Sequence, residues 1–398
     1  MVVAIKIFGR GRTSRSKRKF SETAFPVLAI LFILLSATAL VGVDEKLPST
    51  IEFSPNTPVS HLPQNPWAFC VTDDEIFMIP DYEAGNIKIY EINGQYLELV
   101  NTLGKKGYYG PDKLAKPIYC FYNKDENKFG VMDLGIRKIF IYDRIGRIDF
   151  KRVKEIRCWR GATDFQLIGN KLYISGFKMS QSGEYYALYS IDLNDDRTTL
   201  LLPSYYKYGF ESFDELTKEY YKQHIIEIGI EGWFSAHNDN LYFVWEGDLR
   251  IMKLNIISGE LMLDDTFGEQ SPHYIKPYAS KELIKAHQKG DYDTIISEKS
   301  KMSYIKNIFT TSDNILVIYE GPADVNMDSS VVTNFRIQFY TLRGDFIKEE
   351  LLEGQPDPKM WFDIDRKILY SLSNSMIDTT SITAERGSKP YILKYEIQ

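Results

Sequence analysis

Short apolar segments separated by polar turns recur along most of the chain. In each copy an apolar strand runs into a turn rich in Asp, Asn or Lys, and a second strand then begins with a bulky apolar residue. The first strands are residues 67–71, 118–122, 165–168, 233–236, 305–309 and 360–362. The second strands begin at Ile76, Phe129, Leu172, Leu241, Ile315 and Ile368. This recurring β-hairpin pattern predicts an all-β architecture.

A third strand follows each hairpin, and a turn that usually contains Gly leads to a fourth. The third strands are residues 87–90, 139–142, 188–191, 250–254, 336–340 and 391–397. Four antiparallel strands form one blade of a β-propeller, so residues 65–398 are expected to form a six-bladed propeller. The last copy lacks its own outer strand. We expect Thr50–Phe53, within a linker at residues 44–64, to supply that strand and close the ring.

Two intervals between copies are longer than one blade needs. The second strands of the third, fourth and fifth copies begin 69 and 74 residues apart, whereas a propeller repeat takes about 40–50 residues. Residues 213–228 and 280–297 fall in these intervals and have apolar positions at helical spacing. We therefore expect short helical insertions on the connecting loops.

The N-terminus has a different pattern. Residues 1–25 carry seven basic side chains and one acidic one, and residues 26–43 are without charge. An apolar run of this length is just long enough to span a membrane as a helix, and the basic flank predicts that residues 1–25 stay in the cytoplasm while the rest of the chain is exported. The alternative, a buried helix of a soluble domain, would not explain the basic flank. Ala37-Thr38-Ala39 fits a signal-peptidase site, whereas the long basic segment favours a retained anchor. Signal peptide and membrane anchor both stay open.

Charge divides the chain in the same way. The first 25 residues carry a net charge of +6 and the remainder carries −12. An acidic body repels phosphate backbones, so no nucleic-acid partner is expected. The densest basic run, residues 151–157, alternates as the solvated face of a strand does. The overall content of 44% hydrophobic and 26% charged residues excludes a mainly disordered chain.

The segment that joins the first two copies carries a family resemblance. Gly104-Lys105-Lys106-Gly107 through Lys116-Pro117 is a Gly-rich loop that ends at a Pro before an inner strand, and residues 266–277 are a looser second copy. With the repeated hairpins, this resembles bacterial six-bladed β-propellers of the NHL-repeat-like group, over about residues 50–398. The resemblance implies a binding scaffold, or else a calcium-dependent lactonase, a lyase or a sugar dehydrogenase.

Sequence motifs for chemistry are few. Asp324-Val325-Asn326-Met327-Asp328 begins like a calcium loop, but Ser329 and Phe335 replace the Gly and Glu that such a loop needs, and we interpret it as a solvated acidic loop. The five histidines lack metal-ligand spacing. Cys70, Cys120 and Cys158 are too few and too scattered for a disulfide framework or a metal site. Cys70 and Cys120 lie in apolar strand-like runs and are expected as buried free thiols, with a Cys70–Cys120 disulfide as the alternative. We expect no cofactor, with calcium as the exception.

Aromatic residues supply the candidate site. Trp67, Trp233 and Trp361 lie at the starts of inner strands, and Trp159 lies in a loop beside Arg160 and before Asp164. Strand starts converge on one rim of a propeller's central channel, so these residues are expected to line a shared pocket for a sugar, a peptide or an anionic group. The competing hypothesis is that the tryptophans are wedges packed between blades.

Three functions are consistent with these patterns. The leading hypothesis is an extracytoplasmic binding scaffold that is not an enzyme, held by the N-terminal helix or released after cleavage, with a protein, peptide or carbohydrate ligand. The second is a calcium-dependent enzyme of the lactonase or lyase type with its site in the channel. The third is a subunit of a cell-envelope complex whose helical insertions bind a partner.

Overall fold

The computed structural model describes residues 48–158, 162–203, 214–219, 232–257, 260–268, 271–325, 331–332, 334–354, 356, 359–373 and 390–397. The predicted segments 1–25 and 26–43 lie outside these residues. Among those described, no helix is both long enough and apolar enough to cross a membrane.

Mainly antiparallel β-sheets dominate the described residues. One eight-stranded sheet has the order β2-β3-β4-β5-β1-β28-β27-β26. Its strands are β1 (Ser49–Phe53), β2 (Cys70–Val71), β3 (Ile76–Asp81), β4 (Asn86–Asn93), β5 (Tyr96–Leu103), β26 (Met360–Asp363), β27 (Ile368–Ser373) and β28 (Tyr391–Glu396).

Four further sheets in the described part of the chain each contain four strands. The first two consist of β8 (Pro117–Asn123), β9 (Lys128–Asp133), β10 (Lys138–Arg144) and β11 (Phe150–Arg157), and of β12 (Ala162–Ile168), β13 (Lys171–Met179), β14 (Tyr185–Asp192) and β15 (Thr198–Pro203). The other two consist of β16 (Gly232–His237), β17 (Asn240–Trp245), β18 (Asp248–Ile257) and β19 (Glu260–Phe267), and of β20 (Tyr304–Thr310), β21 (Asn314–Glu320), β24 (Phe335–Thr341) and β25 (Phe346–Leu352).

The remaining elements are short. They are the two-stranded pairs β6 (Lys105–Lys106) with β7 (Lys113–Leu114) and β22 (Asp324–Val325) with β23 (Val331–Val332), the 3-10 turn η1 (Val59–His61), and the helices α3 (Lys281–Lys289) and α4 (Tyr292–Lys299). The two helices confirm the insertion predicted at residues 280–297. In the other predicted insertion residues 215–219 are helical, and most of the rest lies outside the described residues.

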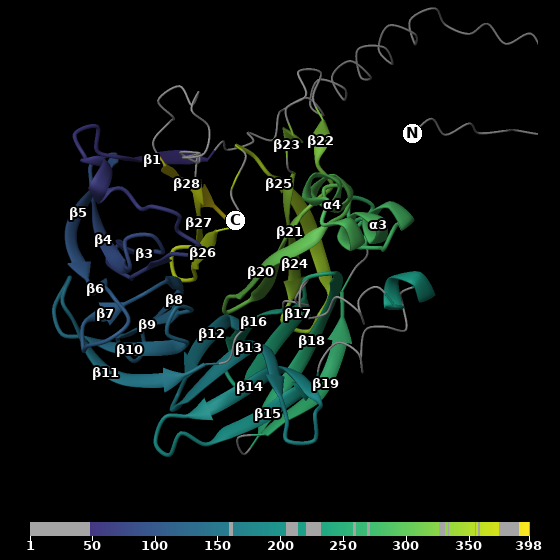
Figure 1. Cartoon of the computed structure of the whole chain (residues 1–398), viewed down its shortest axis with the longest axis horizontal. Helices are drawn as coiled ribbons and strands as arrows, with labels where there is room; N and C mark the ends of the chain where they lie inside the picture. Colours follow the sequence, from purple (N-terminus) through teal and green to yellow (C-terminus); the bar gives the residue numbers. More distant parts are fainter. Residues whose placement is uncertain are drawn as a thin grey trace, which may run out of the picture. The chain divides into compact units, whose positions relative to one another are not determined.

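The sheets follow one another around a common centre, and β8, β12, β16, β20 and β26 lie near it (Figure 1). Adjacent sheets are held together by separate hydrophobic clusters. Phe121 of β8 and Phe165 of β12, for example, meet edge to face with ring centroids 5.0 Å apart. Gly130 of β9 makes room for this pair, because a Cβ there would lie 2.1 Å from the Phe121 ring. The described residues thus form an all-β, propeller-like fold.

Strand β1 joins the two ends of the folded chain. It pairs antiparallel with β28, with Ile51 opposite Ile392, and parallel with β5, with Phe53 opposite Leu97. Ile51 and Phe53 are buried in the cluster that also holds residues of β3, β27 and β28. The early strand therefore lies beside the last repeat and covers an edge that would otherwise be open.

Buried aspartates fix the segments that lead into the first strands. The carboxylate of Asp133, at the end of β9, accepts backbone N–H groups from Ala115, Lys116, Gly135 and Ile136 at 2.6–3.2 Å. Asp81, at the end of β3, accepts the Gln64 N–H at 2.9 Å and forms a buried ion pair with Lys88 at 2.7 Å. Each carboxylate thereby holds the chain that enters β8 or β2 against the neighbouring hairpin.

Candidate functional site

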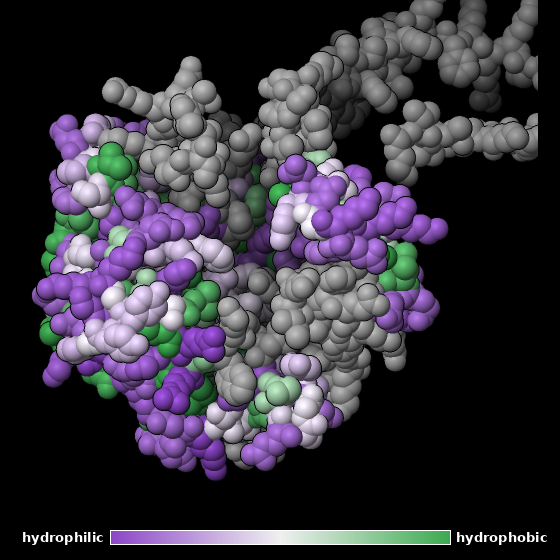
Figure 2. Space-filling view, in the orientation of Figure 1, coloured by the Kyte–Doolittle hydropathy of each residue, from purple (hydrophilic) through white to green (hydrophobic). Residues whose placement is uncertain are grey.

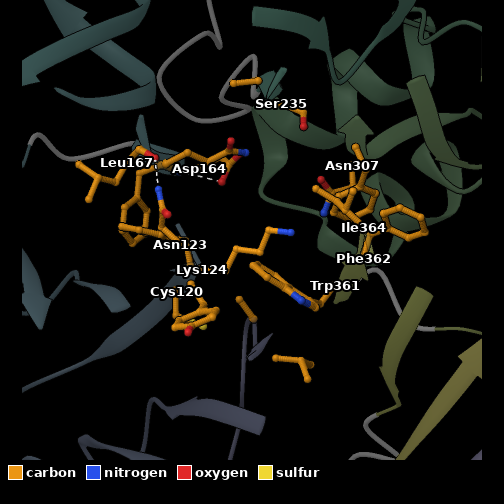
Figure 3. A pocket seen from close by; sticks show the side chains of 18 of the residues that line it. Cys120, Asn123, Lys124, Asp164, Leu167, Ser235, Asn307, Trp361, Phe362 and Ile364 are labelled. Atoms are coloured by element: carbon orange, nitrogen blue, oxygen red, sulfur yellow. Dashed lines mark hydrogen bonds between the residues drawn. The ribbon is translucent and has the colours of Figure 1, made fainter. Parts of the chain in front are cut away.

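A cavity of about 660 Å³ lies where the first strands of the sheets meet. Residues on or directly before β2, β8, β12, β16, β20 and β26 line it. Side chains that are separated by nearly 300 positions in the sequence, such as Trp67 and Trp361, therefore face one space. Figure 3 shows Lys124 and Trp361 extending toward the middle of the cavity, between Cys120 on one side and Asn307 on the other.

Bulges at corresponding places shape three of these strands. The register shifts at Ile118 in β8, at Thr163 in β12 and at Lys306 in β20, where one residue near the strand start has no partner on the next strand. A bulge re-aims the residues beside it. The residues directly after these bulges, Tyr119, Asp164 and Asn307, all line the cavity.

The predicted tryptophans are brought together but differ in their packing. Trp67 lies three residues before β2, is 45% exposed and stacks on Tyr82 with centroids 6.0 Å apart. Trp361 of β26 packs against two hydrophobic clusters. Trp233 of β16 packs against a third cluster and donates its Nε1–H to the Ile305 carbonyl at 3.2 Å. Trp233 and Trp361 thus act partly as wedges, whereas Trp67 belongs to none of the clusters in the described residues.

Asp164 lines the same cavity, whereas Trp159 and Arg160 lie outside the described residues. Desolvation by burial raises the pKa of the Asp164 carboxyl to about 7, against the opposing effect of backbone N–H groups of Phe165 and Phe234. The Phe165 N–H donates to its Oδ1 at 2.8 Å. Asp164 is consequently a carboxyl group that changes its charge near neutral pH inside the cavity.

Neutral amides bridge neighbouring first strands along the wall. Asn123 of β8 donates its Nδ2–H to the Leu167 carbonyl of β12 at 2.8 Å, a bond drawn in Figure 3. Gln166 of β12 donates in the same way to the Phe234 carbonyl of β16 at 2.7 Å. Ser235 of β16 continues the series through its hydroxyl contact with Thr310 of β20 at 2.8 Å. These bonds hold polar side chains at fixed positions in the cavity wall.

Charged side chains gather on the turns at the ends of the first strands. Lys124, after β8, forms an ion pair with Asp365, after β26, at 2.6 Å. Arg144 contacts Asp74 at 2.6 Å and Asp73 at 3.4 Å. The charged residues on these turns are thus largely engaged in ion pairs with one another or with neighbouring residues.

The described residues offer few side chains placed for metal binding or thiol chemistry. Within the described ranges no group of three or more His, Cys, Asp or Glu side chains is arranged to hold a metal ion. Cys70, Cys120 and Cys158 are free. Burial raises the pKa of Cys70 and brings that of Cys158 to about 12, so both are held as thiols at neutral pH. Of the suspected calcium loop, Asp324 and Val325 form β22, and residues 326–330 lie outside the description.

No protein-family model matches the chain. No curated protein is significantly similar to it. Solved structures are more informative. A presumed exported protein of Bacteroides fragilis NCTC 9343 superposes with a TM-score of 0.54 at 12% sequence identity, over 88% of this chain and 95% of that one.

The fold is β-propeller-like. Regucalcin, a calcium-binding protein of Agrobacterium tumefaciens str. C58, covers 85% of this chain and 93% of its own with a TM-score of 0.43 at 11% identity. A luciferin-regenerating enzyme covers 87% and 95% with a TM-score of 0.42 at 11% identity. The likeness to the Bacteroides fragilis protein, at 12% identity, bears on the fold alone.

The site was visible in the sequence only in part. The starts of apolar strands locate Trp67, Trp233 and Trp361, because residues at that position in every repeat share one rim. Asn123, Gln166 and Ser235 give no comparable signal, since a single polar residue within an apolar strand fits a solvated edge equally well. Their shared feature, one polar residue within the first strand of successive repeats, is the pattern that would have found them.

Proposed function

We propose that this chain is an exported, six-bladed NHL-like propeller that binds a ligand in its central cavity and acts as a binding scaffold. The observation that carries the proposal is the cavity itself, to which the first strand of every large sheet contributes. Its volume of about 660 Å³ lies inside the range of roughly 300–1,000 Å³ that small-molecule sites occupy.

Strand connectivity supports the count of six blades. The eight-stranded sheet divides at the β5–β1 junction into two four-stranded halves, β2-β3-β4-β5 and β26-β27-β28-β1. Together with the four separate sheets they make six units of four strands, the number of repeats predicted from the sequence. Asp133 and Asp81 each accept N–H groups from the segment that precedes a first strand. This contact is common to two of the repeats and supports an NHL-like repeat.

Ion pairing favours a scaffold over a calcium-dependent enzyme. Three carboxylates that line the cavity are neutralised by neighbouring bases: Asp365 by Lys124 at 2.6 Å, Asp73 by Arg144 at 3.4 Å and Asp363 by Arg366 at 3.6 Å. A calcium ion needs several uncommitted carboxylate oxygens in one place. Thermal unfolding with and without millimolar calcium tests this choice, because a rise in Tm specific to calcium would favour the enzyme.

Export rests on the N-terminal pattern of seven bases followed by an uncharged segment at residues 26–43. Protease added to intact cells or spheroplasts should digest the propeller while cytoplasmic markers survive. The N-terminal residue of the isolated protein then distinguishes a retained anchor, with Met1 or Val2, from cleavage after Ala39. A propeller protected from the protease in intact spheroplasts would contradict export.

Ligand binding is tested with a variant that fills the cavity. Ala68 is a lining residue with a small side chain, so Ala68→Trp places an indole where a ligand would lie. The full chain and this variant are screened by tryptophan fluorescence against sugars, peptides and organic acids. We expect at least one class to change the emission of the native chain and not of the variant. Equal responses of both proteins, or none from either, would refute the cavity as the site.

A further inference from the structure

The chemistry of the cavity wall narrows the ligand to one class. Among the described aromatic side chains of the wall, Trp67 belongs to none of the hydrophobic clusters. Trp67 is 45% exposed, and its ring stacks on Tyr82, over which the Lys116 ammonium lies 4.9 Å from the ring centroid. A supported and solvent-accessible indole is a flat apolar platform that loses little conformational entropy when a ligand covers it.

The polar part of the wall is neutral and held in place. Asn123 and Gln166 are fixed by donating to backbone carbonyls of the next strand. Asn307 accepts the Ile308 N–H at 2.9 Å through its Oδ1, which leaves its Nδ2 group to donate. The bond made by Gln166 uses its Nε2, which leaves its Oε1 to accept. The cavity therefore offers both a donor and an acceptor without a formal charge.

Most charged side chains of the wall, but not Asp164, are committed to pairs. Lys124 is neutralised by Asp365, and Lys306 by Glu320 at 3.0 Å. A charged ligand that displaces one partner leaves the other charge unpaired in a partly desolvated site, which is unfavourable. Asp164 is uncharged below its pKa of about 7. Below that pH the arrangement selects against anions and cations and in favour of uncharged polar molecules.

We propose that the ligand is an uncharged oligosaccharide, with the apolar face of one sugar ring on Trp67 and its hydroxyl groups on the amides of Gln166 and Asn307. A sugar ring combines an apolar face of C–H groups with a rim of hydroxyls that both donate and accept, which matches a platform flanked by neutral amides. This inference rests on the proposed function and specifies the ligand of the same cavity.

The test uses the full chain in a detergent without a sugar head group, because a glycoside detergent would compete for the site. An array displays neutral oligosaccharides together with uronic-acid and glucosamine oligomers of matching length. Affinities for the best compounds are then measured by titration calorimetry. At pH 6, where Asp164 is largely uncharged, we expect neutral compounds to bind at least 10-fold more tightly than either charged series.

Substitutions of Trp67 distinguish its role as a platform for the ligand from general effects of mutation on the protein. Trp67→Ala should weaken binding of the best neutral oligosaccharide at least 10-fold, whereas Trp67→Phe, which keeps an aromatic face, should weaken it no more than about 3-fold. Tyr109→Ala is the matched control, because Tyr109 is 92% exposed and is not among the residues that line the cavity. It should leave affinity unchanged.

The outcomes also distinguish this inference from the proposed function. Preferential binding of the charged oligomers, or of peptides alone, that Ala68→Trp abolishes would overturn the oligosaccharide and leave the cavity as a ligand site. Oligosaccharide binding that neither Ala68→Trp nor Trp67→Ala affects would overturn both, since the sugar would then lie elsewhere on the surface.

Discussion

Replacing Asp164 with Asn tests the electrostatics of the cavity through protein stability. The pKa of the Asp164 carboxyl is raised from its ordinary value of 3.8 to about 7, mainly because burial disfavours the charged form. At 1.36 kcal/mol for each pH unit, a shift of about 3 units corresponds to roughly 4 kcal/mol when the group is fully ionised. Solvent that reaches the half-buried side chain reduces this energy. We therefore expect Asp164→Asn to raise the free energy of unfolding by about 2–4 kcal/mol where the native carboxyl is ionised.

The sign of the effect follows from the raised pKa. Well below pH 3.8 the carboxyl is neutral in both the folded and the unfolded chain, so it contributes no pH-dependent difference. Between pH 4 and 7 the unfolded chain releases the proton more readily, so the free energy of unfolding falls as the pH rises and levels off above pH 7. Asn cannot ionise and keeps an oxygen that accepts the Phe165 N–H. The variant should therefore be the more stable protein at pH 8.

The assay is urea unfolding of the full chain at several pH values between 5 and 8, followed by tryptophan fluorescence. All five tryptophans lie within residues 65–398, so the signal reports on the propeller. The advantage of Asp164→Asn should grow from pH 5 to about 7 and then remain constant. Asp248→Asn is the control of opposite sign: although burial raises the pKa of Asp248, Arg250 and Lys276 lower it overall, so its replacement should destabilise at neutral pH. A pH-independent difference for Asp164→Asn would refute the reasoning.

Further predictions concern the framework that carries the site. Asp133→Ala removes a buried acceptor of four backbone N–H groups and should lower the free energy of unfolding by about 3–5 kcal/mol. The exposed Asp125→Ala should leave it unchanged within about 0.5 kcal/mol, and equal effects would contradict the role of Asp133. Gly130→Ala places a Cβ against the Phe121 ring and should destabilise by about 1–3 kcal/mol, and Phe121→Leu in the same chain should recover part of the loss in a double-mutant cycle. Trp361→Ala should destabilise by about 2–4 kcal/mol because its ring packs on two clusters, whereas Trp67→Ala should change stability by less than about 1 kcal/mol; the reverse order in urea unfolding would mean that Trp67 is the wedge. Deleting residues 49–53 should expose the edges of β5 and β28 and produce oligomers on size-exclusion chromatography, and a monomer of unchanged Tm would argue against closure by β1.

The sheets were predictable because apolar periodicity and turn residues are local signals. Runs such as Ile139-Phe140-Ile141-Tyr142 lie in β10 with every side chain buried, as expected for a strand covered on both faces. The helices at α3 and α4 followed from local signals as well, since Ser280 and Asp291 cap them by accepting the Leu283 and Thr294 N–H groups.

Much of the site depends on tertiary geometry that no local pattern encodes. The periodicity of apolar residues does not predict the bulges at Ile118, Thr163 and Lys306, although each bulge directly precedes a residue that lines the cavity. Trp67 was expected inside a strand, but β2 begins only at Cys70. That difference matters physically, because a residue outside the ladder can stack on Tyr82 and remain exposed instead of packing between sheets.

The buried aspartates are a signal that was present but unused. Asp81 and Asp133 each end the second strand of a repeat and are followed five residues later by Asn86 or Lys138 at the start of the next strand. An acidic residue at the end of an apolar strand normally indicates a solvated turn. Its recurrence at the same place in two repeats is what distinguishes a structural contact from solvation.

A crystal structure of the full chain with the tightest-binding compound from the array tests the central claim most directly. The account predicts ligand density inside the cavity, in contact with Trp67 and within hydrogen-bond distance of Gln166 or Asn307. The face over α3 and α4 is largely hydrophilic (Figure 2) and lies outside the cavity. Density on that face, or elsewhere on the outer surface with an empty cavity, would contradict it.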